Sequence, residues 1–209
     1  MDKPTERPIV FIVEDDASVR ESLALLLELK GFTVAAFASA EAFLAAYQPA
    51  QTGCLVLDLR LPGMSGLALQ AELAAQSITL PVIIVTAHGD VAAARMALKA
   101  GAVDFIEKPV DDELLIATIG VALEREAIQR QQTSAAAEWA ARLERLSRRE
   151  REVLDYVIAG KQNREIAELL AISVRTVEVY KARMMEKLQA RTVPDLIRLA
   201  LTSPQKIAD

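Results

Sequence analysis

Short apolar runs alternate with amphipathic stretches along the first 125 residues of this 209-residue chain. Apolar runs of four or five residues favour buried strands, and apolar residues at helical spacing favour helices between them. The predicted strands are 9–13, 33–36, 54–57, 82–85 and 103–106. The predicted helices are 17–30, 39–47, 65–76 and 90–100, with a further helix from about residue 111. Glycines at positions 31 and 101 are natural helix stops, and Ser39 is a suitable cap.

This order is that of five βα units. Strands that are continuously apolar are typical of a parallel sheet covered by helices on both faces. Crossovers between parallel strands are right-handed, which winds the helices onto the two faces of the sheet. We therefore predict a doubly wound α/β domain with a five-stranded parallel sheet over residues 1–125.

A linker is predicted over residues 126–142. Alanines and charged residues dominate from Asp111 to Leu146, where the sequence has no proline and only one glycine, Gly120. One long helix and a helix followed by a solvated tether are both compatible with this composition. The least constrained point is the Ser-Ala-Ala-Ala segment at 134–137.

The remaining pattern is entirely helical. Its predicted elements are a capping box at Ser147 and Glu150, helices at 163–170 and 174–188, a turn capped by Ser173 at 171–173, and a last helix from Pro194 to Leu201. Short helices with a three-residue turn between two of them are typical of a helix-turn-helix module. We predict an all-α domain over residues 143–209.

Composition excludes several classes of protein. With 52% hydrophobic and 25% charged residues, the chain can bury a core and is not disordered. One cysteine and one histidine exclude a disulfide framework and a zinc site rich in these residues, so a reducing compartment is expected. The sequence has neither a secretion signal nor an apolar run of about 18 residues, so we expect a cytoplasmic protein with no membrane partner.

The net charge of −5 conceals an asymmetry between the two halves. Residues 1–124 contain 8 Lys and Arg against 17 Asp and Glu, a net charge of −9. Residues 125–209 contain 16 Lys and Arg against 12 Asp and Glu, a net charge of +4. The basic half suits an anionic partner such as nucleic acid.

Chemically reactive groups follow four of the predicted strands: Glu14, Asp15 and Asp16, then Asp58, Thr86 and Lys108. Functional groups of a doubly wound domain gather at the carboxyl ends of its strands, so these residues should meet. Converging carboxylates need a cation between them, and oxygen ligands favour Mg²⁺ over zinc. A lysine and a threonine complement a phosphoryl group, and an aspartate can itself accept one as an acyl phosphate. Any of these residues alone would be an ordinary loop or surface group; together they indicate a functional site.

These residues lie in segments that resemble the receiver domain of bacterial two-component response regulators. The segments are 12–16 (IVEDD), 57–66 (LDLRLPGMSG), 85–87 (VTA) and 99–109 (KAGAVDFIEKP). The resemblance covers nearly all of residues 8–125 and implies a CheY-like, flavodoxin-like fold. It also implies that Asp58 accepts a phosphoryl group from a sensor histidine kinase.

The resemblance further implies a set of ligands for Mg²⁺. Asp15 and Asp58 bind the ion through their side chains, and Arg60 binds it through its backbone carbonyl. Glu14 reaches the ion mostly through water, and family members carry either Glu or Asp at this position. Asp16 is expected to be a neighbour of the ion rather than a ligand.

The same resemblance implies how phosphate is sensed. Thr86 and Lys108 bind phosphate oxygens, and Phe105 is the aromatic switch that turns inward when Thr86 moves. The bond between Lys108 and Pro109 is expected to be cis.

Three residues near the predicted site have simpler interpretations. The Arg60 side chain either influences dephosphorylation or is merely solvated. His88 is interpreted as an ordinary loop residue, because an acid–base or metal role needs a partner that the sequence does not indicate. Cys54 is interpreted as a small core hydrophobe within a strand.

The second domain resembles the LuxR-type DNA-binding domain over about residues 143–203. The matching segments are 146–154, 160–167, 172–179 and 187–188. A helix-turn-helix lays its second helix in the major groove, and here that is the helix 174–188. Its predicted inward face consists of Val177, Met184 or Met185, and Leu188.

The resemblance assigns DNA contacts by position. Glu178, Val179, Lys181 and Ala182 face the groove, Lys161, Asn163, Arg175 and Thr176 lie near phosphates, and Arg183 is on the exposed side. Glu178, where related proteins often have lysine, either accepts a hydrogen bond from cytosine or repels phosphate. Tyr180 stands where the family usually has histidine, which leaves its backbone or core contact open.

Both domains together, with the segments 86–90 (TAHGD) and 104–109 (DFIEKP), are similar to the FixJ-like branch of the FixJ/NarL family. The resemblance implies a non-enzymatic transcription regulator that forms a homodimer, releases its DNA-binding domain, or does both when phosphorylated. The implied partners are a sensor histidine kinase, double-stranded promoter DNA and RNA polymerase. One rival is a Mg²⁺-dependent phosphatase, which usually has a second Asp where this chain has Arg60. The other is an adaptor whose helical module binds protein or RNA.

Overall fold

The computed structural model describes residues 7–87 and 91–202. The chain divides into two compact units, Met1–Ile128 and Gln129–Asp209. This division falls within the segment 126–142, where the sequence predicts a linker. Among the described residues, no helix is both long enough and apolar enough to cross a membrane.

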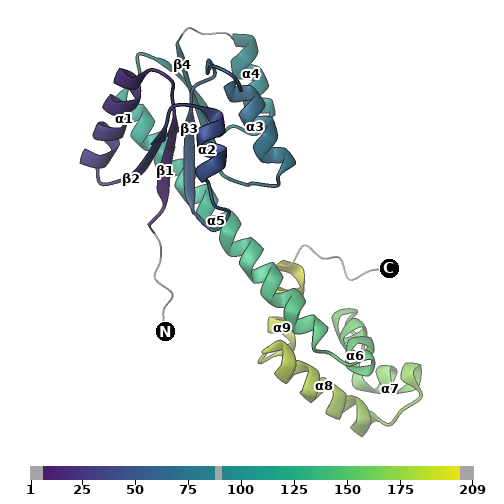
Figure 1. The fold of residues 1–209 in the computed structure, drawn as a ribbon. Coiled ribbons are helices and arrows are strands. Elements are labelled where there is room, and N and C mark those ends of the chain that lie inside the picture. The colour runs from purple at the N-terminus through teal and green to yellow at the C-terminus, as the bar shows by residue number, and fades with distance from the viewer. Residues whose placement is uncertain (1–6, 88–90, 203–209) are drawn as a thin grey trace. The chain divides into compact units, whose positions relative to one another are not determined.

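The described part of the first unit contains a five-stranded parallel sheet in the order β2-β1-β3-β4-β5 (Figure 1). The strands are β1 (Ile9–Val13), β2 (Thr33–Phe37), β3 (Gly53–Leu57), β4 (Val82–Ala87) and β5 (Asp104–Lys108). The helices are α1 (Ala17–Leu29), α2 (Ala40–Ala46), α3 (Gly66–Ala75), α4 (Val91–Lys99) and α5 (Asp112–Glu144). The predicted doubly wound α/β fold is confirmed.

The sheet is buried on both faces, as the continuously apolar strands predict. Successive side chains of a strand point to opposite faces, so each strand contributes to two cores. On one face, Phe11 packs with residues of α2, α3 and α4, including Phe43 and Leu69. On the other face, Ile12 packs with residues of α1 and α5, including Leu27.

Strands β4 and β5 are longer than the sequence predicts. The predicted strands ended at residues 85 and 106, whereas β4 includes Thr86 and Ala87 and β5 includes Lys108. The two ends pair with each other, with Thr86 opposite Glu107 and Ala87 opposite Lys108. Pairing between the two neighbouring strands stabilises these residues in the strand conformation. The hydrophobic pattern of a single segment does not indicate which strand lies next to it.

Glycine has a strict steric role at the start of β3. Gly53 has φ 149°, and a Cβ at this position would lie 1.7 Å from the carbonyl oxygen of Ile9. Only glycine therefore allows β3 to approach β1 so closely at this end. The predicted cap is also confirmed, since the Ser39 hydroxyl accepts a hydrogen bond from the backbone N–H of Ala42 in α2.

One helix, α5, extends through the predicted linker. It is continuous from Asp112 to Glu144, so the long-helix alternative is the one that the structure adopts. Leu115 and Ile119 near its start belong to a core of the first unit. Trp139 near its end is buried in the core of the second unit.

The second unit is helical throughout its described residues and contains α6 (Arg148–Ile158), α7 (Asn163–Leu170), α8 (Val174–Leu188) and α9 (Val193–Thr202). The predicted caps at Ser147 and Ser173 are both present. Ala171 adopts a left-handed conformation, φ 53°, which ends α7 and turns the chain towards α8. Val177, Met184 and Leu188 of α8 are buried in the core, and Met185 is half-buried.

Glu150 joins the start of α6 to the end of α8. Its side chain is buried, and Oε2 accepts hydrogen bonds from the Ser147 N–H at 2.8 Å and from Lys187 Nζ at 2.6 Å. Burial opposes ionisation, but the Lys187 ammonium and the Ser147 N–H outweigh it and lower the pKa of Glu150. The carboxylate is therefore a charged tie between two helices of the module.

We predict that Glu150→Gln lowers the free energy of unfolding of the second unit by about 2 kcal/mol at pH 7, since it removes charge-assisted hydrogen bonds. The folded pKa of Glu150 is below its ordinary value of 4.5, so its stabilisation is complete above that pH and disappears as the pH falls through the folded pKa. The difference between variant and wild type should therefore shrink in acid. The fluorescence of Trp139, the only tryptophan, reports urea unfolding of this unit specifically.

Glu152→Gln is the matched control for this prediction. Glu152 lies on the same helix and pairs with Arg148 and Arg149 at the surface, at 3.1 and 2.8 Å. Surface pairs contribute less than about 1 kcal/mol. Equal losses in the two variants would contradict the role assigned to Glu150.

Candidate functional site

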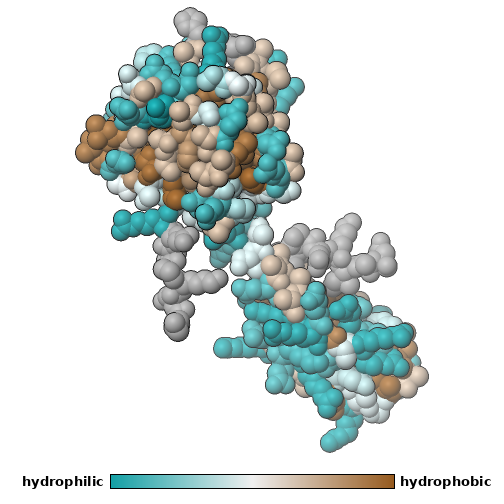
Figure 2. Space-filling view, viewed as in Figure 1, coloured by the Kyte–Doolittle hydropathy of each residue, from teal (hydrophilic) through white to brown (hydrophobic). Residues whose placement is uncertain are grey.

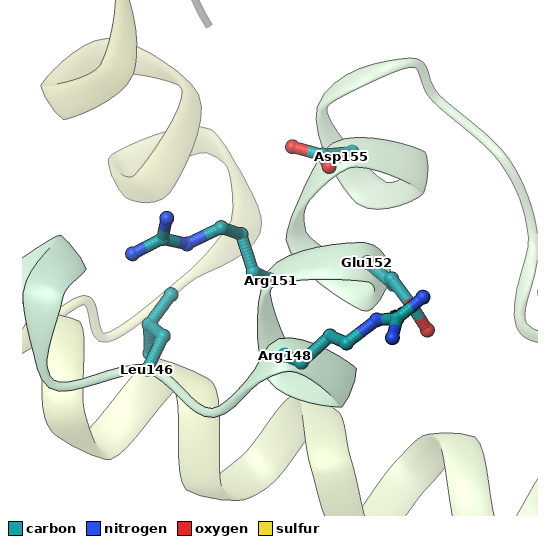
Figure 3. A pocket seen from close by; sticks show the side chains of 5 residues that line it. All are labelled: Leu146, Arg148, Arg151, Glu152 and Asp155. Atoms are coloured by element: carbon teal, nitrogen blue, oxygen red, sulfur yellow. Dashed lines mark hydrogen bonds and ion pairs between the residues drawn. The ribbon is translucent and has the colours of Figure 1, made fainter.

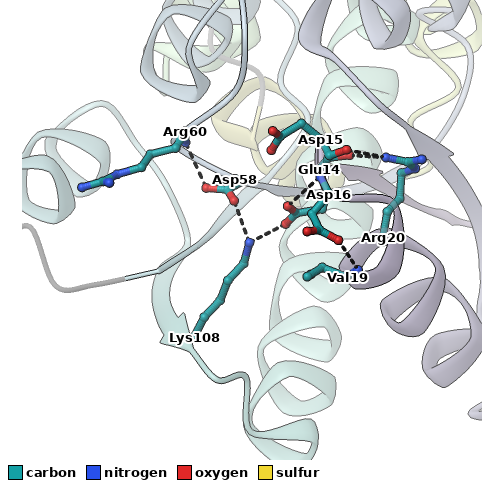
Figure 4. Close-up of polar contacts among 8 residues, drawn as sticks. All are labelled: Glu14, Asp15, Asp16, Val19, Arg20, Asp58, Arg60 and Lys108. Carbon is teal, nitrogen blue, oxygen red and sulfur yellow. Dashed lines mark hydrogen bonds and ion pairs between the residues drawn. The ribbon is translucent and has the colours of Figure 1, made fainter.

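Three carboxylates meet at the carboxyl end of the sheet (Figure 4). Glu14 and Asp15 follow β1, and Asp58 follows β3. These strands are neighbours in register, with Val13 opposite Leu57, so the residues after them lie side by side. One oxygen from each carboxylate lies within 4.8 Å of the others. Glu14 and Asp58 are buried and Asp15 is exposed, an all-oxygen donor set that fits a divalent cation of the Mg²⁺ type.

Lys108 lies between two of these acids. Its Nζ is 2.5 Å from Glu14 Oε2 and 2.6 Å from Asp58 Oδ2. Burial raises the pKa of Glu14, and Lys108 opposes this effect. Burial acts to lower the pKa of Lys108, but hydrogen bonds to Asp58 and Glu14 outweigh it and raise that pKa. With all groups ionised, the ammonium bonds two of the three clustered carboxylates, and the excess negative charge of the cluster suits a cation.

Asp58 is held on its other side by the β3–α3 loop. Its Oδ1 accepts a hydrogen bond from the Arg60 N–H at 2.9 Å. The Arg60 guanidinium is exposed and points away from the acids (Figure 4). A Cβ on Gly66 would lie 2.3 Å from the carbonyl oxygen of Asp58, so glycine allows α3 to begin directly against this residue.

Two residues that the sequence analysis did not single out hold the loops of the site. Arg20 donates from one guanidinium nitrogen to the carbonyl oxygens of Glu14 and Asp15. Glu41 accepts a hydrogen bond from the N–H of Met64 at 2.9 Å, in the β3–α3 loop. The contact made by Arg20 could have been predicted from its position in the sequence, about one helical turn after the acids. Glu41 is 23 residues from Met64, and the sequence contains no signal for that contact.

The remaining predicted residues occupy three different settings. Thr86 is buried in β4, two residues beyond Ile84, which pairs with Leu57 just before Asp58. Phe105 is half-buried and packs against the core beneath α2, α3 and α4. His88 lies outside the described residues.

The structure also describes three residues with smaller expected roles. The Asp16 side chain accepts a hydrogen bond from the Val19 N–H and caps α1. The bond between Lys108 and Pro109 is cis. Cys54 is fully buried in β3, and burial raises the pKa of its thiol to about 12, which fits a core hydrophobe.

The second unit presents the residues predicted to contact DNA on and beside α8. Those exposed are Lys161, Arg175, Glu178, Val179, Ala182 and Arg183; those half-buried are Asn163, Thr176 and Lys181. Hydrophilic residues cover most of the face of this unit that is seen in Figure 2. The Thr176 hydroxyl shares a hydrogen bond with that of Ser173, and Lys181 Nζ donates to Asn163 Oδ1 at 3.3 Å. Tyr180 packs against the core, which answers the open question of its contact.

A separate cavity of about 400 Å³ lies beside the start of α6 (Figure 3). Its lining residues are Leu146, Arg148, Arg151, Glu152 and Asp155. Burial raises the pKa of Asp155, with Arg151 opposing the effect. None of the residues predicted to contact DNA lines this cavity.

A doubly wound domain with acids and a lysine at its strand ends, joined to a helix-turn-helix module, defines the class of two-component transcriptional regulators. The response regulator receiver domain family matches residues 10–120, and the luxR family of bacterial regulatory proteins matches residues 144–200. The chain belongs to the response regulator family, with a receiver domain and a LuxR-type DNA-binding domain.

Relatives match both domains. Transcriptional regulatory protein FixJ of Azorhizobium caulinodans is 48% identical over 200 residues, which cover 96% of this chain and 95% of the relative. FixJ of Rhizobium meliloti is 48% identical over 192 residues, covering 92% and 94%. Among solved structures, response regulator StyR aligns with a TM-score of 0.86 and 41% identity, covering 94% of this chain and 99% of StyR. Full-length FixJ from B. japonicum aligns with a TM-score of 0.59 and 43% identity, covering 95% and 98%.

We predict that Gly66→Ala destabilises the first unit by about 1–3 kcal/mol, because its Cβ would meet rigid backbone at Asp58. Gly120→Ala is the matched control, since a Cβ there meets nothing within 4 Å. In the helical interior of α5, that exchange should stabilise by roughly 0.5–1 kcal/mol. Urea unfolding followed by circular dichroism, with hydrogen exchange of β3 peptides, measures both effects. Stability gains of similar size in both variants would contradict the close approach.

Proposed function

We propose that Asp58 is the phosphoacceptor of a receiver domain that controls DNA binding by the second unit. The observation that supports this most directly is Lys108, whose ammonium contacts the Asp58 carboxylate at 2.6 Å and Glu14 at 2.5 Å. An ammonium beside the Asp58 carboxylate would be able to bond a phosphoryl group carried by that residue. Charge added to Asp58 would change how strongly Lys108 bonds Asp58 relative to Glu14.

Mg²⁺ is the cation proposed for this site. Glu14, Asp15 and Asp58 would hold it with their carboxylates, together with the backbone carbonyl of Arg60, and Glu14 would act mainly through water. When bound, the ion neutralises charge on the acids and on the phosphoryl oxygens. The donor set of oxygens without histidine or cysteine supports Mg²⁺ over zinc.

The proposed reaction transfers a phosphoryl group from a phosphohistidine of a sensor histidine kinase. The P–N bond to the imidazole breaks, and a P–O bond forms to a carboxylate oxygen of Asp58, which yields an acyl phosphate. Lys108 then bonds a phosphate oxygen as a point charge, and the Thr86 hydroxyl donates to another. In this proposal Asp58 carries the phosphoryl group until its acyl phosphate hydrolyses, so the domain acts as a switch and does not turn over a substrate.

The switch is proposed to act through α4 and β5. Movement of Thr86 towards phosphate vacates space for the half-buried Phe105 ring, which repacks inward. Residues 90–110 then present a different surface, which forms a homodimer or releases the second unit, or does both. A two-fold dimer matches two half-sites on promoter DNA.

DNA recognition is assigned to α8. Glu178, Val179, Lys181 and Ala182 are proposed to face the major groove, with Arg183 beside them. Lys161, Asn163, Arg175 and Thr176 are proposed to contact phosphates. Phosphate contacts position the helix and base contacts discriminate, so the protein would regulate transcription of a promoter read by RNA polymerase.

The first experiment is light scattering coupled to size-exclusion chromatography, with Mg²⁺ and acetyl phosphate. We predict that the wild type shifts from monomer to dimer, while Asp58→Asn folds normally and does not shift. Asp16→Asn is the matched control, because it makes the same exchange of carboxylate for amide at a side chain that caps α1, and Asn caps a helix as well as Asp does. A phosphorylated wild type that stays monomeric would favour release of the second unit. A wild type that is not phosphorylated would contradict the assignment of Asp58.

DNA binding is tested on a mixed-sequence duplex by fluorescence anisotropy. We predict that Arg175→Ala combined with Lys181→Ala weakens binding, and that loss of the Arg175 phosphate contact lowers the slope of log affinity against log salt by about 1. Arg148→Ala is a control for the loss of a surface positive charge outside the proposed DNA contacts, since its side chain is 92% exposed and pairs with Glu152. Unchanged DNA affinity in the double variant, with the fold intact by circular dichroism, would favour an adaptor that binds protein or RNA.

A further inference from the structure

We propose that Arg20 is a positioning residue that sets the acidic loop, residues 14–16, for cation binding; this rests on the Mg²⁺ site of the proposed function. Its guanidinium nitrogen Nη1 donates to the carbonyl oxygen of Glu14 at 2.8 Å and to that of Asp15 at 3.1 Å (Figure 4). Although two carboxylates are close by, the hydrogen bonds that Arg20 makes are to backbone oxygens. The guanidinium therefore holds the peptide units that carry the two acids.

Peptide geometry extends this effect into the site. A trans peptide unit is planar, so its carbonyl and its N–H point in opposite directions. When Arg20 holds the carbonyl of Asp15, the N–H of Asp16 is aimed the other way. That N–H lies 3.4 Å from Glu14 Oε1, on the side of the acids. Arg20 thereby fixes the orientation of a donor that faces a buried carboxylate.

The acidic loop is held at three places, and Arg20 accounts for the middle of it. The N–H of Glu14 donates to the carbonyl oxygen of Phe37 in β2, and the Asp16 side chain caps α1. Between these points, the carbonyls of Glu14 and Asp15 are held by Arg20. Electrostatic repulsion among Glu14, Asp15 and Asp58 acts on this same stretch of backbone. Without the guanidinium, the peptide units are free to rotate and the carboxylates to separate.

A purely electrostatic role for Arg20 has the opposite consequence. A positive charge beside a cation site disfavours the cation, so its removal should tighten Mg²⁺ binding. Loss of a residue that orients the ligands should instead weaken Mg²⁺ binding, typically about 10–100-fold for residues that hydrogen-bond to metal ligands. The sign of the change in affinity therefore separates the two roles.

The test is isothermal titration of the full chain with Mg²⁺ alone. Arg20→Met should weaken Mg²⁺ binding about tenfold or more. Arg20→Lys should weaken it less, because lysine keeps a charged donor, but still measurably, because its side chain is shorter and lacks the planar fork. Lys30→Met removes an equal charge from the far end of the same helix, where Lys30 is exposed, and should bind Mg²⁺ as the wild type does. Circular dichroism establishes that each variant is folded.

An affinity of Arg20→Met that equals or exceeds that of the wild type would overturn the inference. If Arg20→Met does not fold, Arg20→Lys decides, and wild-type affinity in that variant would overturn it equally. These outcomes leave the proposed function intact, provided that wild type binds Mg²⁺ and Asp58→Asn weakens it. A wild type that does not bind Mg²⁺ would overturn the cation site and the role of Arg20 together.

Discussion

Repulsion among three carboxylates at the end of a buried sheet is the constraint to which the rest of the receiver domain responds. Burial raises the pKa of Glu14, so the charged form is held at some expense in stability. The Lys108 ammonium, the Arg60 N–H and the Arg20 guanidinium each restrain part of the cluster. Gly66 leaves no side chain between α3 and Asp58. The Asp58 carboxylate is itself bonded by two of these groups, the Lys108 ammonium and the Arg60 N–H.

The second unit uses a similar pair of groups for a different purpose. Glu150 also bonds an ammonium, that of Lys187, at 2.6 Å, and it also accepts a backbone N–H. No competing acid is among the groups that shift its pKa, and the balance lowers that pKa below its ordinary value. Burial raises the pKa of Glu14, and the charge of Asp58, with which Glu14 shares Lys108, acts in the same direction. In the second unit one carboxylate bonds the ammonium and joins two helices, whereas in the receiver domain two carboxylates share one ammonium.

Helix α5 is part of the core in both units. Ile119 packs under the sheet of the receiver domain, and Trp139 is buried among α6, α8 and α9 of the DNA-binding domain. Arg142 near its end donates to the carbonyl oxygen of Leu188, the last residue of α8. The final turns of α5 therefore belong to the scaffold that supports the helix assigned to DNA. The segment predicted as a linker from composition is therefore helical, and its end, with Trp139, is part of the core of the second unit.

The sequence by itself determined the elements and their order, because periodicity, caps and helix-ending glycines are local properties. It also placed Asp58, Thr86 and Lys108 at one edge, since parallel strands end together. Only the tertiary structure decided that Lys108 bridges Glu14 and Asp58, which are 94 and 50 residues away. It alone decided that β4 and β5 extend each other, that Gly66 meets the backbone of Asp58, and that Arg20 binds carbonyls rather than acids. Contacts of this kind depend on which surfaces pack against each other, and the local sequence pattern does not specify those surfaces.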